Sequence, residues 1–239
     1  MNEFLSRTEA LLGKDAVSKL QKSRVALFGL GGVGGFALES LVRSGIGHID
    51  IFDFDTISPS NINRQIIATS KNIGTKKTEA AYLRVKEISP DTEITVYDMF
   101  YLPENADLVD MSKFDLVIDA VDTVTAKLEI IKNAKESHTK IISCMGTGNK
   151  TDITRLKVGD LFSTSGCPLA RIMRKELRAR GIDSLKVVWS DEKPMFSEDT
   201  KDLKGNRPAP ASAIFVPAAA GLLLAKEAIY MLLAEDNNG

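Results

Sequence analysis

Short apolar runs alternate along residues 24–146 with segments whose apolar positions recur at the helical spacing. The runs rich in β-branched and aromatic residues lie at 24–28, 48–53, 93–98, 114–120 and 140–146. The helical spacing lies at 35–44, 76–88 and 124–137. This alternation predicts a Rossmann-like, doubly wound α/β fold, in which helices cover both faces of a mainly parallel sheet. In such folds the ligand binds at the carboxyl ends of the strands.

The pattern changes in the second part of the chain. Residues 147–210 break the alternation, which predicts a helical and irregular insertion, or crossover region, around one helix. The apolar run Ala209–Ala225 is interrupted by prolines and falls short of the roughly 20 apolar residues of a membrane-spanning helix. We therefore predict a C-terminal core strand and helix within 211–235, with the helix at 218–233. Residues 1–239 are expected to form a single domain.

The composition is that of an ordinary soluble globular protein. The 239 residues carry a formal net charge of −1 and are 44% hydrophobic, so no general affinity for polyanions follows from the charge. The N-terminal sequence MNEFLSRTEALLG has no apolar core behind a basic start. We therefore expect no secretory signal and a cytoplasmic protein.

The two cysteines, Cys144 and Cys167, are too few for a disulfide framework. They also form no paired CxxC motifs, so we expect no structural zinc. An activated thiolate needs a cationic neighbour, and neither cysteine has a histidine beside it in the sequence. We favour structural or incidental roles for both, although Arg171 could supply a cation to Cys167 and leaves a nucleophilic role open there.

A glycine-rich sequence, GLGGVG, follows the first predicted strand and opens the next helix. Gly29, Gly31 and Gly34 match the G-x-G-x-x-G pattern, and Gly32 adds a further glycine. Backbone N–H groups of such a turn, and of the helix N-terminus, can face phosphate oxygens. The motif predicts a nucleotide site; the alternative is a glycine turn selected only for tight packing.

The second strand ends at Asp53, 19 residues after Gly34, where an acid can hold ribose hydroxyls. These features place a nucleotide-binding core at 24–146 but do not distinguish NAD from ATP. The stretch DFDTISPSNINRQ favours ATP, because Asn61 and Arg64 follow the acid and Lys77 begins the next helix. Cations suit a triphosphate whose pyrophosphate leaves with added charge.

A divalent metal is expected beside a triphosphate of this kind. Asp122 lies at the end of the fourth predicted strand, in DAVDT, where its carboxylate can bind magnesium. Asp55 is a weaker second candidate in the same region.

The sequences GLGGVGG, DFDTISPSNINRQ, GTKKTEA and DAVD, in this order, resemble the adenylating fold of the ubiquitin-activating (E1-like) superfamily. The resemblance implies that Asp53 holds the ribose of ATP and that Asp122 coordinates Mg²⁺. It further implies that Asn61, Arg64 and Lys77 hold the triphosphate, and that a carboxylate is activated as its acyl-adenylate.

The same resemblance implies a homodimer in which an N-terminal arginine reaches the ATP of the partner subunit. Arg7 stands at the matching position in LSRTEALLG. A plain surface role for Arg7 is the alternative.

A basic stripe is predicted within residues 147–210. Four cations occupy positions i, i+3, i+4 and i+7 of the predicted helix, while four apolar residues occupy another face. The cations are Arg171, Arg174, Lys175 and Arg178, and the apolar residues are Leu169, Ile172, Met173 and Leu177. In a slightly acidic chain such a stripe indicates contact with a phosphate backbone; the alternative is a solvated amphipathic helix.

The second half, with residues 142–178 and SAIFVPAAAGLLLAKEAI, is similar to the tRNA threonylcarbamoyladenosine dehydratases. This resemblance implies adenylation of the carboxylate of the threonylcarbamoyl group on adenosine 37 of tRNA, followed by cyclisation with release of AMP. Two alternatives stay open: adenylation of a ubiquitin-like sulfur carrier, and a nucleotide-binding scaffold without catalysis. The scaffold is disfavoured because Arg64, Lys77 and Asp122 are all present.

Some members of that family take up sulfur from a cysteine desulfurase through a cysteine near the C-terminal apolar segment. The corresponding stretch here, GNRPAPASAIF, contains no cysteine. A partnership with a sulfur-transfer system is therefore open, and relay through this position is not expected.

Overall fold

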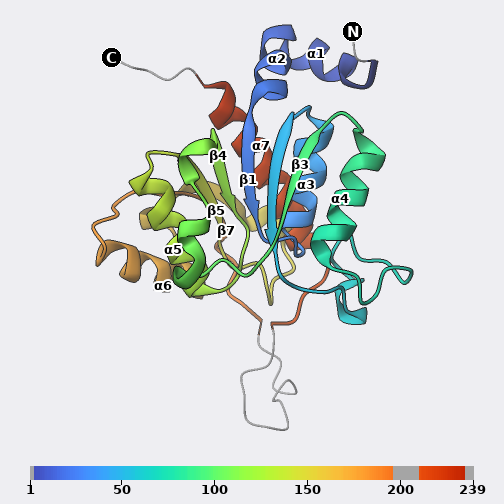
Figure 1. Cartoon of the computed structure of the whole chain (residues 1–239). Helices are drawn as coiled ribbons and strands as arrows, with labels where there is room; N and C mark the ends of the chain where they lie inside the picture. Colours follow the sequence, from blue (N-terminus) through green and yellow to red (C-terminus); the bar gives the residue numbers. More distant parts are fainter. Residues whose placement is uncertain (1–2, 196–209, 235–239) are drawn as a thin grey trace.

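The computed structural model describes residues 3–195 and 210–234. Seven strands form one sheet in the order β3-β2-β1-β4-β5-β7-β6 (Figure 1). All neighbouring strands pair in parallel except β6 and β7, which pair antiparallel. The strands are β1 (Arg24–Phe28), β2 (His48–Asp53), β3 (Glu93–Asp98), β4 (Leu116–Asp119), β5 (Lys140–Cys144), β6 (Leu156–Asp160) and β7 (Lys186–Ser190).

Helices cover both faces of the sheet, with α3, α4 and α7 on one face and α5 and α6 on the other (Figure 1). The α-helices are α1 (Ser6–Leu12), α2 (Lys14–Lys22), α3 (Gly34–Arg43), α4 (Lys77–Ile88), α5 (Val124–Glu136), α6 (Pro168–Arg178) and α7 (Phe215–Leu233). Short 3-10 helices are η1 (Glu3–Leu5), η2 (Pro59–Asn61), η3 (Pro103–Leu108), η4 (Met111–Lys113), η5 (Ile153–Arg155) and η6 (Leu161–Ser163).

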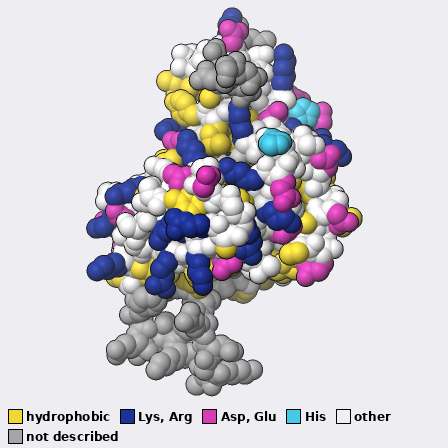
Figure 2. Space-filling model, turned by 90° about the vertical axis from the view of Figure 1, so that its left-hand side faces the viewer, with side chains coloured by type: hydrophobic (Ala, Val, Ile, Leu, Met, Phe, Trp, Pro, Cys, Tyr) yellow, Lys and Arg dark blue, Asp and Glu magenta, His cyan; other side chains and the backbone are white. Residues whose placement is uncertain are grey.

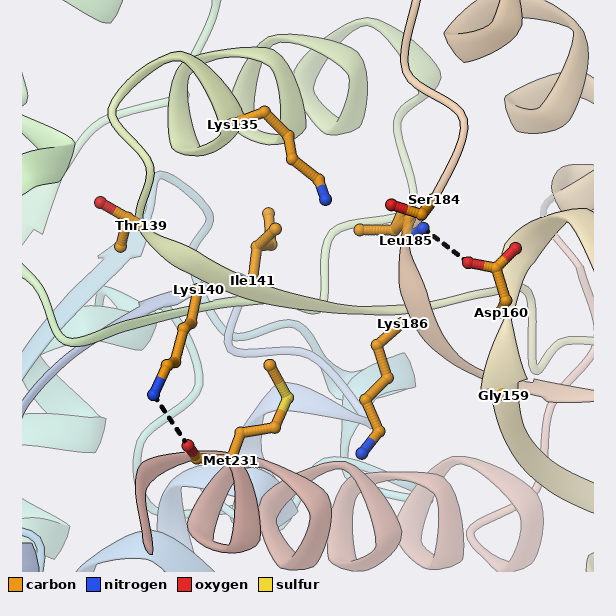
Figure 3. A pocket seen from close by; sticks show the side chains of 10 residues that line it. All are labelled: Lys135, Thr139, Lys140, Ile141, Gly159, Asp160, Ser184, Leu185, Lys186 and Met231. Atoms are coloured by element: carbon orange, nitrogen blue, oxygen red, sulfur yellow. Dashed lines mark hydrogen bonds between the residues drawn. The ribbon is translucent and has the colours of Figure 1, made fainter. Parts of the chain in front are cut away.

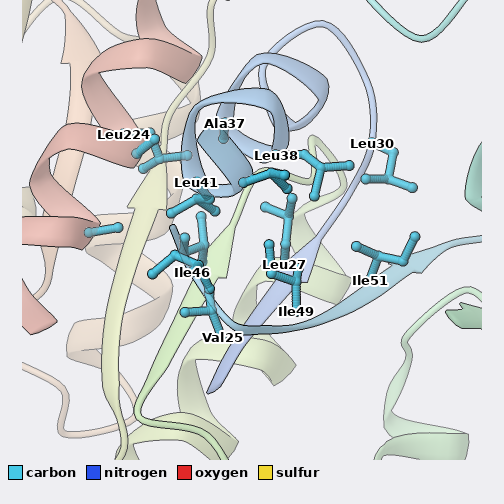
Figure 4. Close-up of a cluster of buried hydrophobic side chains, with 14 of the residues drawn as sticks. Val25, Leu27, Leu30, Ala37, Leu38, Leu41, Ile46, Ile49, Ile51 and Leu224 are labelled. Carbon is cyan, nitrogen blue, oxygen red and sulfur yellow. The ribbon is translucent and has the colours of Figure 1, made fainter. Parts of the chain in front are cut away.

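The core has two layers because successive side chains of a strand point to opposite faces of the sheet. Leu27 of β1 packs in one cluster with Leu38 of α3 and Leu224 of α7 (Figure 4). The next residue, Phe28, packs in the opposite cluster with Trp189 of β7. A strand buried on both faces is hydrophobic throughout, which explains why the central strands were visible in the sequence.

The predicted fold class is confirmed, and the predicted strands and helices of residues 24–146 correspond to β1–β5 and α3–α5. The expectation for 147–210 was incomplete, because β6 and β7 of this segment extend the sheet beside β5. Short five-residue strands in a polar segment give little periodic signal, so only α6 was foreseen. Residues 196–209 of this segment lie outside the described residues.

The C-terminal prediction also needs correction. The helix is present as α7, but the described residues 210–234 contain no core strand. By length and composition α7 could cross a membrane, yet 50% of its apolar stretch is buried inside the fold. It packs against α3 and against strands β4, β5 and β7, as a core helix does.

The chain enters the sheet from α1 and α2, which lie at the amino ends of the parallel strands, at the top of Figure 1. The turn between β1 and α3 lies at the opposite, carboxyl edge. This direction decides which side chains can gather at a ligand site.

Close packing of α7 on α3 fixes the start of α3. Gly221 of α7 lies so close that an added Cβ would be 2.4 Å from the carbonyl oxygen of Val33 and 2.8 Å from Cβ of Phe36. The two helices therefore meet nearly backbone to backbone at the point where the glycine-rich turn becomes a helix.

We predict that Gly221→Ala lowers the free energy of unfolding by about 1–3 kcal/mol, because the overlap with Val33 outweighs the better helix propensity of alanine. The control is Leu222→Ala on the same helix, where the side chain is 54% exposed. Its effect should stay within about 0.5 kcal/mol. Chemical denaturation of both variants measures the difference, and equal stabilities would contradict the proposed backbone contact.

Candidate functional site

The glycine-rich turn between β1 and α3 is shaped by two close backbone approaches. Gly29 has φ +89°, and a Cβ there would lie 2.9 Å from the carbonyl oxygen of Ala120. At Gly34 a Cβ would lie 1.8 Å from the carbonyl oxygen of Gly29, which is sterically impossible. Only glycine fits both positions, so the turn brings α3 directly onto the end of β1 and next to the end of β4. Gly31 and Gly32 lie between them in the same turn.

Asp53, the last residue of β2, faces this turn. Its Oδ2 accepts a hydrogen bond from the N–H of Leu30 (2.7 Å), and its Oδ1 accepts one from the N–H of Asp55 (2.9 Å). Burial raises the pKa of Asp53, while the Lys77 ammonium and the two backbone donors oppose this rise. The carboxylate thus lies beside the turn, as the sequence pattern predicted, and is already engaged with its backbone.

Lys77, at the start of α4, is a buried cation of this edge, with 5% exposure. Its Nζ lies 2.5 Å from Oδ2 of Asp55 and 4.0 Å from Oδ1 of Asp53. The backbone N–H of Lys77 donates to the carbonyl of Asp55 as well (3.0 Å). A buried ammonium next to the glycine-rich turn can bind an anionic ligand, which would compete with Asp55 for its protons.

The loop after β2 carries Asn61 and Arg64. Asn61 Oδ1 accepts from the N–H of Ser58 (3.1 Å) and so closes the short helix η2. Arg64 Nη1 donates to the carbonyl of Ser60 (2.7 Å) and to Oδ1 of Asn63 (3.0 Å). A Cβ at Gly32 would lie 3.6 Å from Cγ of Arg64, which places this loop against the glycine-rich turn.

Two residues of this loop were not singled out in the sequence. Asn63 also donates from Nδ2 to the carbonyl of Ser212 (2.8 Å), linking the loop to the segment before α7. Gln65 is buried, and its Oε1 lacks a hydrogen-bond partner. A Cβ at Gly31 would lie 4.0 Å from its Nε2, so this polar side chain lies beside the glycine-rich turn. Both residues stood in the motif NINRQ, but only tertiary packing gives them these contacts.

Asp122 is exposed in the loop that follows β4. The same loop touches the glycine-rich turn, since a Cβ at Gly29 would lie 3.1 Å from the N of Val121. Within residues 3–195 and 210–234 no group of three or more His, Cys, Asp or Glu is placed to hold a metal. Magnesium usually takes one or two carboxylates and completes its shell with water and substrate phosphates. One exposed carboxylate beside this turn therefore fits magnesium that is carried by a nucleotide.

Arg7 is not brought to this edge by its own chain. It is exposed on α1, which lies at the amino ends of the strands, whereas the glycine-rich turn lies at the carboxyl ends (Figure 1). A role for Arg7 at the site therefore requires a second copy of the chain.

The basic stripe lies on α6, on the side of the molecule shown in Figure 2, where Lys and Arg side chains gather. Arg171 and Lys175 are exposed. Arg174 donates to the carbonyl (2.9 Å) and hydroxyl oxygens of Thr164, and the Arg178 guanidinium lies 5.2 Å above the ring of Phe162.

The four cations therefore differ in how they are held. Arg174 is half-buried against the preceding loop, whereas Arg171, Lys175 and Arg178 are exposed, Arg178 while it also contacts Phe162. The predicted apolar face was partly wrong, because Ile172 is 44% exposed while Ala170, Met173 and Leu177 are buried. The buried apolar face of α6 is therefore formed by Ala170, Met173 and Leu177, at positions i, i+3 and i+7.

Cys144 lies at the carboxyl end of β5 and Cys167 at the start of α6. Both are buried. Burial raises the pKa of Cys144 to about 12, with a smaller opposing effect of Lys127. Lys150 is buried nearby and donates to the carbonyl of Ser190 (2.8 Å). Burial lowers the pKa of Lys150, and its interaction with Cys167 opposes this shift. Lys150 is a cation near Cys167 that the sequence did not indicate.

A cavity in the described part of the chain lies away from this site. It has a volume of about 430 Å³ and is lined by the start of β5 and β7. Figure 3 shows Lys135 entering it from α5, while Lys140 and Lys186 extend toward α7. This is the amino edge of the sheet, so the cavity is distinct from the carboxyl-edge site.

Three comparisons place this geometry among known proteins. The model of the ThiF family matches residues 5–239. A tRNA threonylcarbamoyladenosine dehydratase of Bacillus subtilis (strain 168) is 37% identical over 240 residues, covering 96% of this chain and 94% of that protein.

The structure of the E. coli tRNA N6-threonylcarbamoyladenosine dehydratase TcdA in complex with ATP superimposes with a TM-score of 0.87 and 29% identity. The match covers 96% of this chain and 93% of that one. An adenylyltransferase and sulfurtransferase, uba4, of Ogataea parapolymorpha is 31% identical over 171 residues, covering 70% of this chain and 43% of that protein.

We predict that Cys144 of the native protein does not react with iodoacetamide at pH 8, because its thiol is 3% exposed and has a pKa of about 12. Denaturation should make it react as a free cysteine. Peptide mass spectrometry before and after denaturation measures the labelling. Fast alkylation of native Cys144 would show that this end of β5 opens, and would contradict its structural role.

Proposed function

Because this chain belongs to the ThiF family, we propose that it is an ATP-dependent tRNA threonylcarbamoyladenosine dehydratase. The observation that carries the proposal is the 37% identity with the Bacillus subtilis dehydratase across 96% of the chain. That span includes the second half, in which the choice of substrate is expected to lie. The resemblance predicted from the sequence motifs is thereby confirmed.

The chemistry begins with the activation of a carboxylate. A free carboxylate is a poor electrophile, so the carboxylate oxygen of the threonylcarbamoyl group attacks the α-phosphorus of ATP and pyrophosphate leaves. The α-phosphoryl and leaving pyrophosphate oxygens gain charge, which preorganised cations stabilise. The buried Lys77 ammonium beside the glycine-rich turn supports this role, since a cation in a poorly hydrated position acts more strongly than one in water.

The site residues predicted from the sequence have the following roles in this proposal. Asp53 accepts from the ribose, and the N–H groups of the turn at Gly31, Gly32 and Gly34 face the phosphates. Gly29, whose own N–H donates to the carbonyl of Phe52 (2.8 Å), shapes the turn around them. Asn61, Arg64 and Lys77 hold the triphosphate, and Asp55 keeps the Lys77 ammonium in place before ATP binds, as their 2.5 Å contact supports. Asp122 would hold Mg²⁺, which would neutralise phosphate charge when bound.

Ring closure follows activation. A nitrogen or oxygen of the neighbouring carbamoyl group attacks the activated carbonyl carbon, AMP leaves, and a proton is lost. The sum of the two steps removes one water from the modified nucleoside. Because attacking and leaving groups belong to one molecule, this step needs mainly orientation.

The second candidate, adenylation of a ubiquitin-like sulfur carrier, is less favoured. The Ogataea parapolymorpha adenylyltransferase and sulfurtransferase matches only 70% of this chain, at 31% identity. The dehydratase of Bacillus subtilis matches 96% at 37% identity. A cysteine desulfurase stays an open partner of the dehydratase, without relay through the cysteine-free stretch GNRPAPASAIF.

A homodimer and a cytoplasmic location complete the proposal. Arg7 lies at the amino edge, so it would reach ATP only in the site of a second copy. Substrate tRNA is present in the cytoplasm, which agrees with the proposed location.

The basic helix α6 is proposed to contact the phosphate backbone of tRNA. Arg171 and Lys175 are exposed and have no contact with the preceding loop among the described interactions, so they are the better candidates. Arg178 is exposed but lies over Phe162, and Arg174 is half-buried against Thr164. Phosphate contacts of this kind release counterions, so they make binding depend on salt.

Purified protein with ATP, Mg²⁺ and tRNA that carries the threonylcarbamoyl group should release AMP and convert the nucleoside to a product lighter by one water, as mass spectrometry can measure. Lys77→Ala should lower kcat by at least about 100-fold, because a preorganised charge on the leaving group is lost. Lys22→Ala, on α2 at the amino edge, is the matched control and should leave kcat unchanged.

AMP release that depends on a ubiquitin-like carrier protein, with none on the modified tRNA, would contradict the dehydratase proposal. Full turnover by folded Lys77→Ala would contradict the site assignment alone. The two results can be told apart because the first concerns the substrate and the second concerns the variant.

We predict that Arg171→Glu with Lys175→Glu weakens tRNA binding and reduces the slope of log K against log[salt] by about one for each lost phosphate contact. The control, Lys14→Glu with Lys22→Glu on α2, makes the same change of charge at the amino edge. Fluorescence anisotropy over a salt series measures both. Equal slopes for the two variants would show that α6 is only a solvated helix.

A further inference from the structure

A fully buried ion pair lies beneath the carboxyl edge. Lys127, the fourth residue of α5, has no exposure, and neither has Asp119 at the end of β4. Lys127 Nζ lies 2.8 Å from Oδ2 of Asp119 and donates to the carbonyls of Val121 (2.9 Å) and Cys144 (2.7 Å). A lysine ammonium has three donors, and here each has an acceptor.

Asp119 completes the same network from the other side. Its Oδ2 accepts from the hydroxyl of Ser143 (2.6 Å), its register partner on β5, and its Oδ1 accepts from the N–H of Val121 (3.2 Å). The two peptide groups that flank the Cα of Val121 are therefore both held: the N–H by Asp119 and the carbonyl by Lys127. Val121 directly precedes Asp122 in the chain.

Burying the Lys127 ammonium costs desolvation free energy. Burying two charges demands close compensation, and apolar residues of similar volume often stabilise a fold equally well. A cation in the first turn of a helix is also disfavoured by the helix dipole. Stability of α5 alone therefore does not account for a lysine at this position, whereas control of the loop backbone does.

The loop controlled by this pair adjoins the nucleotide site. Ala120 donates its N–H to the carbonyl of Phe28 (2.8 Å), and a Cβ at Gly29 would lie 3.1 Å from the N of Val121. The pair thus fixes the backbone that presents Asp122 relative to the glycine-rich turn.

We propose that Lys127 is a positioning residue for the adenylation reaction: paired with Asp119, it holds the backbone of Val121 so that the Asp122 carboxylate is presented to nucleotide-bound magnesium. This inference rests on the proposed function and deepens it. Lys127 touches neither substrate nor cofactor and acts only through the loop.

The double variant Lys127→Met with Asp119→Asn tests this without leaving a buried charge unpaired. The amide from Asp119→Asn can still accept from Val121 N–H and bond Ser143, while the Val121 and Cys144 carbonyls lose their donor. We expect a melting temperature close to that of the wild type, and a half-saturating Mg²⁺ concentration for AMP release raised at least about tenfold. The KM for modified tRNA should change less than twofold.

A merely structural role would lower the amount of active enzyme but leave its Mg²⁺ requirement unchanged. The matched control is Lys132→Met, which removes the partly buried 3.3 Å pair with Glu129 on the same helix and should leave the Mg²⁺ requirement as in the wild type. An unchanged requirement in the double variant would overturn the proposal.

A second measurement needs neither tRNA nor magnesium. Amide hydrogen exchange of the wild-type protein should show the Val121 N–H protected as strongly as β4. In the double variant the Val121 carbonyl has lost its donor, so this protection should weaken although the N–H keeps an acceptor. Exchange of Val121 at the rate of an exposed loop in the wild type would overturn the proposal, even where the double variant fails to fold. If the wild type releases no AMP on modified tRNA, the proposed function fails, and the exchange result still decides the role of Lys127.

Discussion

The carboxyl edge of this sheet depends on the contact of three backbone segments that leaves no room for side chains. Gly34 lies against the carbonyl of Gly29, and Gly29 lies against the carbonyl of Ala120. These contacts bring the start of α3, the end of β1 and the loop after β4 to one point. Without them the N–H groups of the turn and the loop that carries Asp122 would be separated by at least the width of a side chain.

The buried cations at the carboxyl edge differ in whether a ligand can reach them. Lys77 and Lys127 are both buried cations, but they differ in their partners. Lys127 uses its donors on Asp119 and two carbonyls, whereas Lys77 is paired with the half-exposed carboxylate of Asp55. A ligand phosphate can replace a half-exposed partner more readily than a fully buried one. Of these two cations, Lys77 is therefore available to a ligand, whereas Lys127 holds the backbone of the loop after β4.

The second half of the chain is part of the same body as the nucleotide core. Strand β7 pairs with β5 and places α6 beside α5, on the face opposite α3 and α7. The link from Asn63 to Ser212 joins the loop of Arg64 to the segment before α7. A substrate that meets the second half is therefore held in fixed relation to the phosphate-binding turn, which suits an enzyme that activates and cyclises one group.

The sequence by itself determined the parallel core, the glycine-rich turn and the residue types of the site, because buried strands and tight turns tolerate few residues. The family resemblance was also visible there, and the comparisons confirm it. The roles of Asp53, Lys77 and Asp122 stay predictions. Only the tertiary structure decided that β6 and β7 extend the sheet, and that Lys127 is a buried partner of Asp119. Such contacts join residues far apart in the chain, and no local periodicity encodes them.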